Sequence, residues 1–203
     1  MTKNFVFNMG YDTSHVTSVL ASEGLEANSS IILVTPPDHD SRQENAIDDI
    51  SNFLGSLDYQ TSLEVFPAGK SVKEDIKEFC DIFSRTENLI LSLSGGPRDT
   101  LISLTIAATL SENDLEKIFF RSDIDSNLQE LAIPQINFDL EEADQKMLKN
   151  FTEEKKVSEV VENVEFSEST VYRYLNSLKK QRLIEESKDG EYRTTSIGEI
   201  LIN

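Results

Sequence analysis

Residues 89–110 place a strand, a glycine turn and a helix in direct succession, and this stretch constrains the fold most. Residues 89–93 form an apolar run of strand length, which Ser94-Gly95-Gly96 interrupts. Pro97 suits the first helical position, because its missing N–H costs nothing there. The helix that follows is apolar on almost every side, so it should lie against a sheet. Glycines without Cβ atoms, free N–H groups at the helix start and Arg98 would suit a phosphate, while a plain structural turn remains the alternative.

The first two thirds of the chain repeat this alternation of strand and helix. Ser30 to Thr35, for example, is a continuous apolar run, which is typical of a strand covered on both faces in a parallel sheet. The expected strands are 4–9, 30–35, 61–66, 89–93, 117–121 and 129–133, and the expected helices are 13–23, 41–57, 71–83 and 97–110. The short connections imply right-handed crossovers, and residues 1–137 are therefore predicted to form an α/β domain.

In such a sheet, ligands bind beyond the carboxyl ends of the strands, so the loops at that edge are the candidates for a site. These loops gather glycines, hydroxyls, Lys70 and Arg98, and they cover residues 9–15, 35–41, 67–71 and 94–98. The first loop has one glycine instead of G-x-G-x-x-G, and the second strand ends in Thr35 instead of an acid, which argues against an NAD domain. Residues 68–71 lack the first glycine of a P-loop, which argues against a nucleoside triphosphatase.

Other classes of site are excluded by the rarity of the residues they need. Cys80, the single cysteine, cannot form an internal disulfide, fits a reducing cytoplasm and lies among apolar residues at helical spacing. With one cysteine and two histidines, we expect no zinc site and no cofactor. No G-x-S-x-G elbow accompanies His15 or His39, so no catalytic residue is assigned. No apolar run approaches the roughly 18–20 residues that span a membrane, and the N-terminus reads as a strand rather than a signal peptide.

Residues 138–203 follow a different pattern. A helix over 138–152 is expected to link the two parts, and a short helix over 157–164 follows it. Ser167 should cap a longer helix over 169–184, and Asp189-Gly190 should turn a hairpin over 184–195. Short helix, turn, longer helix and hairpin is the order of a winged helix-turn-helix. The predicted domains are thus 1–137, a linker helix 138–152, and a winged helix-turn-helix domain 153–203.

Charge supports DNA binding locally, although the chain as a whole has a net charge of −18. Residues 169–184 carry four basic side chains and no acidic one. The expected DNA contacts lie on this helix and on the hairpin: Ser169, Thr170, Tyr172, Arg173, Asn176, Lys179, Lys180, Lys188 and Arg193. A wing rich in acids (Glu185, Glu186, Asp189, Glu191) opposes them. Two alternatives stay open: a winged helix used only for protein contacts, and DNA binding in a salty cytoplasm where acidic surfaces are usual.

Gly10-Tyr11-Asp12 with a following hydroxyl, Ser94-Gly95-Gly96-Pro97-Arg98, and the winged helix after them resemble the archaeal CRISPR-associated transcriptional regulators, over essentially the whole chain. Members of this family carry an N-terminal CRISPR-associated Rossmann-fold (CARF) sensor domain. The resemblance implies a Rossmann-like three-layer sandwich, a cytoplasmic homodimer, and one symmetric pocket for a cyclic oligoadenylate, most often the tetra-adenylate. The ligand-binding residues it implies, together with the sheet-edge loops, are Gly10, Tyr11, Asp12, Thr13, Ser14, His15, Thr35, Ser94, Gly95, Gly96, Pro97 and Arg98.

The resulting hypothesis is a ligand-responsive regulator of CRISPR-Cas genes in antiviral defence that binds promoter DNA and is not an enzyme. One alternative is a metabolite-sensing winged-helix regulator unrelated to CRISPR. Another is a sensor that also slowly cleaves its cyclic ligand, with Ser14, His15, Lys70 and Arg98 as candidate residues. An effector ribonuclease of the related kind needs a C-terminal Arg-x(4–6)-His motif, and no histidine follows His39.

Overall fold

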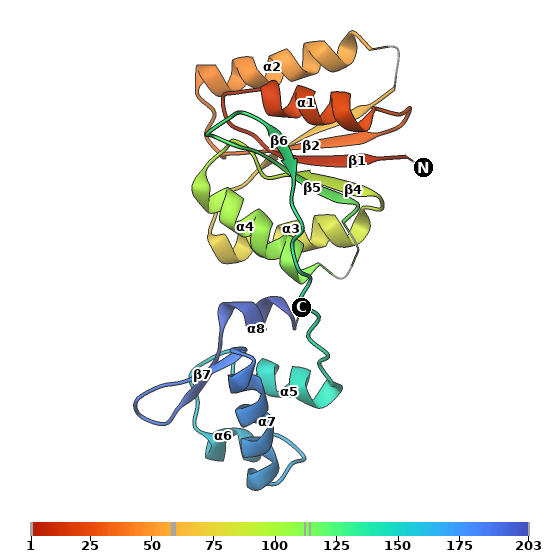
Figure 1. Cartoon of the computed structure of the whole chain (residues 1–203). Coiled ribbons are helices and arrows are strands. Elements are labelled where there is room, and N and C mark those ends of the chain that lie inside the picture. Colours follow the sequence, from red (N-terminus) through yellow and green to blue (C-terminus); the bar gives the residue numbers. More distant parts are fainter. Residues whose placement is uncertain (1, 58–59, 112, 114, 203) are drawn as a thin grey trace. The chain divides into compact units, whose positions relative to one another are not determined.

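The computed structural model describes residues 2–57, 60–111, 113 and 115–202, and the chain divides into two compact units. The first unit is Met1–Asn137 and the second is Phe138–Asn203 (Figure 1). Each unit has its own hydrophobic core, and each is described by itself below.

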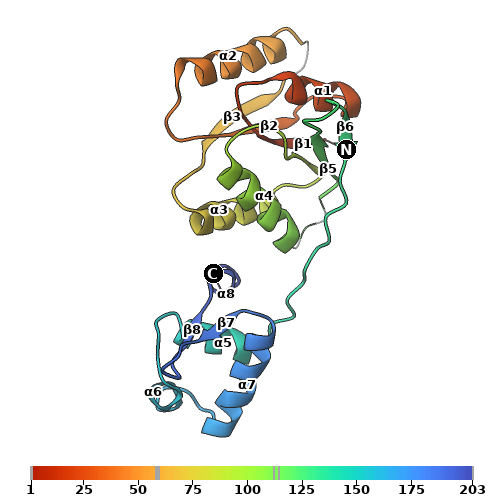
Figure 2. The same cartoon turned by 60° about the vertical axis from the view of Figure 1, so that its left-hand side comes forward.

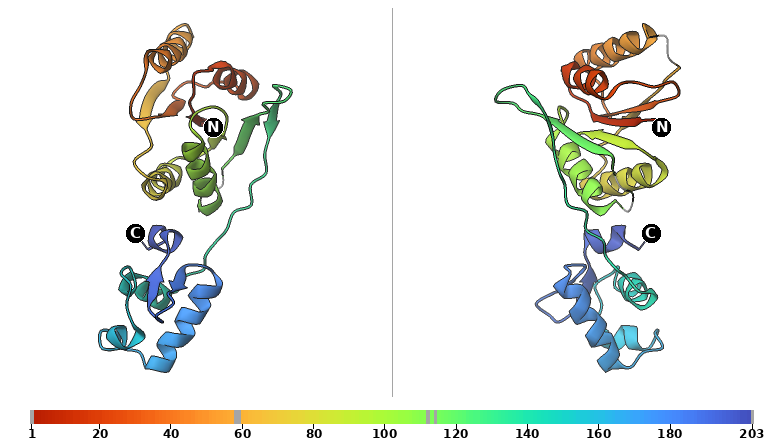
Figure 3. Two further views of the ribbon diagram at one scale, coloured as in Figure 1. Left: turned by 90° about the vertical axis from the view of Figure 1, so that its left-hand side faces the viewer. Right: turned by 45° about the vertical axis from the view of Figure 1, so that its right-hand side comes forward.

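The first unit is built on a sheet of six strands in the order β3-β2-β1-β4-β5-β6. The strands are β1 (Asn4–Asn8), β2 (Ser30–Thr35), β3 (Ser62–Pro67), β4 (Leu89–Ser92), β5 (Lys117–Arg121) and β6 (Leu128–Glu130). All neighbours pair in parallel except β5 and β6, which form an antiparallel hairpin that projects beyond the sheet (Figure 3). The strand order reverses at β1, between β2 and β4, so their carboxyl ends form the crevice in which such sheets bind ligands.

Four helices cover the sheet, two on each face (Figure 1). They are α1 (Ser14–Glu23), α2 (Ser41–Gly55), α3 (Val72–Arg85) and α4 (Arg98–Leu110). Helices α1 and α2 cover one face and α3 and α4 the other, which explains why the central strands β1 and β4 are apolar along most of their length and buried. The predicted α/β class, a Rossmann-like three-layer sandwich with a mostly parallel sheet, is confirmed.

The predicted position of Pro97 differs from the structure. Pro97 has ψ 149° and immediately precedes α4, so it is the residue before the helix rather than its first helical residue. The strand β3 alternates between exposed and half-buried residues, because it lies at the edge of the sheet, and so it lacks the continuous burial of β1.

The second unit contains α5 (Glu142–Asn150), α6 (Val157–Val161), α7 (Glu168–Lys180), the hairpin β7 (Ile184–Glu186) and β8 (Tyr192–Thr194), and α8 (Ser196–Ile200) (Figure 2). The side chain of Ser167 accepts a hydrogen bond from the backbone N–H of Thr170, so Ser167 is the N-cap of α7, as predicted. Gly190 turns the hairpin with φ +75°. Helix, turn, longer helix and hairpin follow one another as the sequence predicts.

The segment expected to be a linker helix, 138–152, instead belongs to the second unit. Met147, Leu148 and Phe151 are fully buried in the same core as Val171 and Leu175 of α7. This apolar face requires a partner, and α7 supplies it, so α5 is the first helix of the C-terminal domain.

Candidate functional site

Two loops meet at the carboxyl ends of β1 and β4, at the left-hand edge of the sheet in Figure 1. Gly95 and Gly96 have φ +75° and +65°, a conformation that side chains other than glycine rarely adopt. The Asn8 amide donates a 2.5 Å hydrogen bond to the carbonyl oxygen of Gly95. A Cβ on Gly10 would lie 2.7 Å from the backbone nitrogen of Gly96. The glycines are therefore needed for the close approach of the two loops.

A cavity of about 500 Å³ opens beside these loops, and we call it the base cavity. Six of the predicted ligand residues line it: Gly10, Tyr11, Asp12, Gly95, Gly96 and Pro97. The remaining lining residues are Met9, Pro36 and Gln43, which the sequence did not single out. Thr35, also predicted, is fully buried and its hydroxyl is 2.8 Å from the Nε2 atom of His39, so it supports the loop after β2 rather than lining the cavity.

A second cavity of about 280 Å³ shares Asp12 and Gly95 with the first, and we call it the polar cavity. Its other lining residues are His15, Ser94, Arg121, Ser122, Asp123 and Ser126. Four predicted residues, Asp12, His15, Ser94 and Gly95, thus come together here with Arg121, the last residue of β5. The two cavities form adjoining compartments on either side of the glycine turn.

Arg121 ties together three loops around the polar cavity. Its guanidinium contacts the carboxylate of Asp12 at 3.3 Å and bonds to the hydroxyl of Ser14, while its Nε atom donates to the carbonyl oxygen of Ser126 at 3.0 Å. Its backbone N–H donates to the Ser94 hydroxyl at 2.6 Å. Hydrogen bonds from Ser14 and the charge of Arg121 hold the pKa of Asp12 below its usual value.

His15 lies in the first turn of α1 and is 2% exposed. Burial lowers the pKa of this histidine, which keeps the ring neutral at physiological pH. Its Nε2 atom is buried without a hydrogen-bond partner among the described residues, as are Asn8 Oδ1 and Ser92 Oγ. Three polar atoms near the glycine turn are therefore buried without hydrogen bonds, so this edge of the sheet has a polar interior.

The remaining candidates lie outside both cavities. Arg98 is exposed at the start of α4 and makes no hydrogen bond or ion pair with the described residues, and Thr13 precedes α1 without a side-chain cap bond. Lys70, a candidate for ligand cleavage, bonds to Glu78 at 2.7 Å. Burial raises the pKa of the Cys80 thiol to about 11, so it is protonated at neutral pH. The structure therefore does not assemble Ser14, His15, Lys70 and Arg98 into one cluster.

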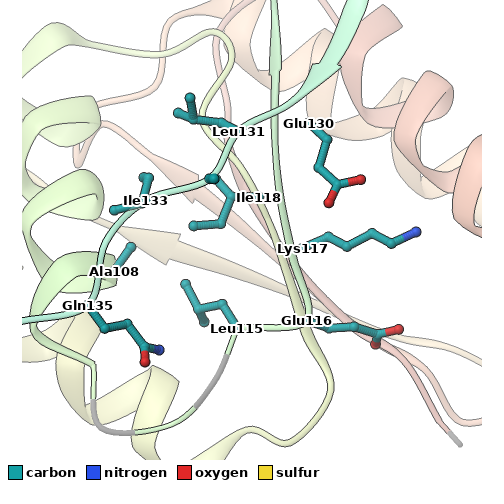
Figure 4. Close-up of a pocket in the computed structure, with 10 residues that line it drawn as sticks. Ala108, Leu115, Glu116, Lys117, Ile118, Glu130, Leu131, Ile133 and Gln135 are labelled. Carbon is teal, nitrogen blue, oxygen red and sulfur yellow. The ribbon is translucent and has the colours of Figure 1, made fainter.

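A third cavity, of about 330 Å³, lies between α4 and the segment that follows β6 (Figure 4). Leu115, Ile118 and Ile133 provide apolar lining, and Lys117 bonds to the buried carboxylate of Glu23 at 2.9 Å. None of the predicted ligand residues lines it.

Within the described part of the chain, no group of His, Cys, Asp or Glu side chains could hold a metal ion. No described helix is long and apolar enough to cross a membrane.

The predicted DNA contacts of the second unit lie on the exposed side of α7 and on the hairpin. Ser169, Tyr172, Arg173, Asn176, Lys179, Lys180, Lys188 and Arg193 are exposed, and Thr170 is half-buried and bonded to Ser167. The ammonium of Lys179 pairs with Glu186 of β7, and this hydrogen bond raises the pKa of Lys179 and lowers that of Glu186. An acid of the wing thus neutralises one of the basic residues of α7.

Gln43 and Arg121 are among the lining residues that the sequence reasoning missed. Arg121 ends a predicted strand at the correct edge of the sheet, so strand polarity alone could have identified it. Gln43 lies in the first turn of a helix that follows a loop at this edge, a position with no motif attached to it.

Comparison with known proteins assigns both units. Residues 3–132 match the Csa3 CRISPR-associated Rossmann-like domain, and residues 146–186 match the helix-turn-helix of the bacterial regulatory proteins of the arsR family. No curated protein matches the sequence. The crystal structure of protein VC1899 from Vibrio cholerae is similar, with 16% identity and a TM-score of 0.47. The similarity covers 98% of this chain and 65% of that one, so the present chain spans about two thirds of that protein's length.

The first match covers most of the α/β unit, and the second begins within α5, in keeping with the burial of that helix in the C-terminal core. The chain therefore belongs to the CRISPR-associated family defined by the Csa3 Rossmann-like domain, here joined to an ArsR-type helix-turn-helix.

Proposed function

We propose that the protein is a homodimeric, cytoplasmic regulator of CRISPR-Cas genes that binds promoter DNA and responds to a cyclic oligoadenylate, with cyclic tetra-adenylate as the first candidate. The observation that carries the proposal is the pair of adjoining cavities at the crevice of the sheet, which share Asp12 and Gly95. The first is lined mainly by apolar residues and the Gln43 amide, with Tyr11 and Asp12 beside them, and the second mainly by charged and hydroxyl groups. A nucleotide needs both kinds of surface, one for its base and one for its ribose and phosphate.

The phosphate half of the proposal rests on the glycine turn and on α4. The first N–H groups of α4 have no partner within the helix, and the helix dipole favours an anion at that end. Arg98 is exposed there with its charge unpaired among the described residues. Two copies related by a two-fold axis would offer two such helix ends to a ring of phosphates.

The DNA half rests on α7, whose exposed side carries Arg173, Lys180 and Asn176. A recognition helix of this kind reads base edges in the major groove, while basic side chains around it bind phosphates. Because α5 is part of the C-terminal core, a shift in the segment that precedes α5 would move the whole domain rather than bend a free linker. Ligand binding would then change the spacing of the two recognition helices of a dimer.

The proposal is tested by measuring the two affinities and their coupling with the full chain. Calorimetry with cyclic tri-, tetra- and hexa-adenylate is expected to detect binding, with the tetra-adenylate tightest. A promoter duplex is expected to bind with an affinity that falls as salt rises, and the ligand should change that affinity. The change must be reciprocal, so DNA should alter the ligand affinity by the same factor. Absence of ring binding, or DNA affinity that ignores a bound ring, would refute the proposal.

Replacing Glu186 with glutamine is expected to strengthen DNA binding. The substitution releases Lys179 from its ion pair, so one more ammonium becomes available to a phosphate. The slope of log K against log salt should steepen by about 0.9, the value for one additional phosphate contact on duplex DNA. Fluorescence anisotropy with a labelled duplex at several salt concentrations measures both quantities.

The matched control is Glu154→Gln, which removes the same charge from the same unit without releasing a lysine, because the exposed Glu154 side chain makes no hydrogen bond or ion pair with the described residues. The two variants share any general effect of lower negative charge. Equal slopes for both would show that Lys179 does not reach DNA.

A further inference from the structure

We propose that Gln43 selects the base of the ligand, by pairing its side-chain amide with the N6 and N7 atoms of an adenine that occupies the base cavity. This inference rests on the proposed function, because it assigns a part of the same ligand to a part of the same site. Gln43 belongs to α2, and not to the glycine turn or the loop after β1.

The lining of the base cavity suits a flat, uncharged ring better than a phosphate. Met9, Pro36 and Pro97 are apolar, and the lining contains no lysine or arginine. Its volume of about 500 Å³ lies within the ~300–1,000 Å³ range of small-molecule sites. The one acidic residue there, Asp12, is paired with Arg121 on the polar side. We therefore place a base in this cavity, and the phosphates at the start of α4 and near Arg121.

Gln43 brings the one side-chain amide in this lining, and a hydrogen bond to the backbone indicates which way that amide faces. It is 3% exposed, and its Nε2 atom donates to the carbonyl oxygen of Met9 at 3.4 Å. A backbone carbonyl can only accept, so the nitrogen of the amide must face Met9. One N–H and the Oε1 atom then remain without a partner among the described residues. A glutamine with a free N–H and a free oxygen is the partner that matches the N7 acceptor and N6 donor of adenine.

The start of α2 holds the residues around this amide in place. Asp40 caps the helix, and its carboxylate accepts the backbone N–H of Gln43 at 2.9 Å. The same carboxylate accepts a 3.0 Å hydrogen bond from the hydroxyl of Tyr11, a bond that raises the pKa of the tyrosine. The guanidinium carbon of Arg42 lies 4.1 Å from the centre of the Tyr11 ring. Tyr11, half exposed, is thus held beside the cavity as a surface on which a base can stack.

The test compares cyclic tetra-adenylate with rings in which every adenine is replaced by 7-deaza-adenine, which lacks the N7 acceptor, or by purine, which lacks the N6 amine. Calorimetry with the wild-type chain should show each analogue binding about 10-fold or more weakly, since a bidentate amide–adenine pair contributes discrimination of this order. A Gln43→Leu variant should bind the natural ring about 10–100-fold more weakly and should bind all three rings equally.

Gln135→Leu is the matched control, because Gln135 also donates its amide to a backbone carbonyl, that of Asn113 at 3.2 Å, but lies at the third cavity. It should keep both affinity and discrimination. If the wild type binds all three rings equally, base selection by Gln43 is refuted while ring sensing stands, and this measurement needs no variant. If the wild type binds none of the rings, the proposed function fails and this inference fails with it.

Discussion

A Gly96→Ala variant is expected to bind cyclic tetra-adenylate about 100-fold more weakly than the wild type, which is ~2.8 kcal/mol at 1.4 kcal/mol per tenfold change. Gly96 has φ +65°, and a Cβ there would lie 2.6 Å from the Cγ atom of Asn8. Asn8 is fully buried at the end of β1 and cannot move aside, because its amide also holds the carbonyl oxygen of Gly95. The glycine turn must therefore shift, and both cavities share its residues.

The free energy of unfolding of the same variant should also fall by about 2–4 kcal/mol. Two causes contribute: alanine disfavours the left-handed backbone, and its Cβ atom would overlap the Asn8 side chain. Gly24→Ala is the control: Gly24 lies in the same domain with φ +77°, but a Cβ there meets nothing within 4 Å. It should lose stability through its backbone alone and keep ligand affinity. Chemical denaturation and calorimetry measure the two quantities. Equal ligand affinity in both variants would show that the turn does not touch the ligand.

The layers of the fold were predictable because they follow from short-range pattern. Continuous apolar runs such as 30–35 identify buried parallel strands, and the intervening apolar stripes identify their helices. The role of α5 was not predictable, because an amphipathic helix between two domains has the same pattern whether it links them or joins one core. Only its packing against Val171 and Leu175 decides the question.

The candidate site was predictable where it depends on backbone conformation and strand polarity. Gly10, Gly95 and Gly96 meet because their strands β1 and β4 are neighbours that run in the same direction. Arg121 ends a predicted strand at this edge and could have been identified in the same way. Gln43 could not, because it reaches the site through a long side chain from a helix, and the packing of that helix against the loops is a tertiary property. Arg98 and Lys70 show the converse: they come from the correct edge but line neither cavity.

Replacing Arg121 with methionine should weaken ring binding about 10–100-fold, the range expected for loss of hydrogen bonds to a charged group. Methionine keeps the apolar stem but removes the bonds to Asp12, Ser14 and Ser126. The substitution also removes the cation that pairs with Asp12, which stays ionised beside the polar cavity. The negative charge of Asp12 then repels an entering phosphate. The expected loss therefore combines a loosened loop with an exposed anion.

Asp12→Asn in the Arg121→Met background separates these two contributions. Removal of the uncompensated carboxylate should recover part of the affinity, whereas a purely structural role of Arg121 predicts no recovery, since asparagine restores none of the lost contacts with Ser14 and Ser126. Arg85→Met is the control, because Arg85 also bonds to a backbone carbonyl and pairs with an aspartate, Asp81, on α3. Calorimetry on the wild type, the single variants Arg121→Met and Asp12→Asn, and the double variant gives the coupling energy between residues 12 and 121 directly. A coupling near zero would mean that the carboxylate of Asp12 faces no phosphate in the complex, and that the negative charge of the ligand lies entirely at the start of α4.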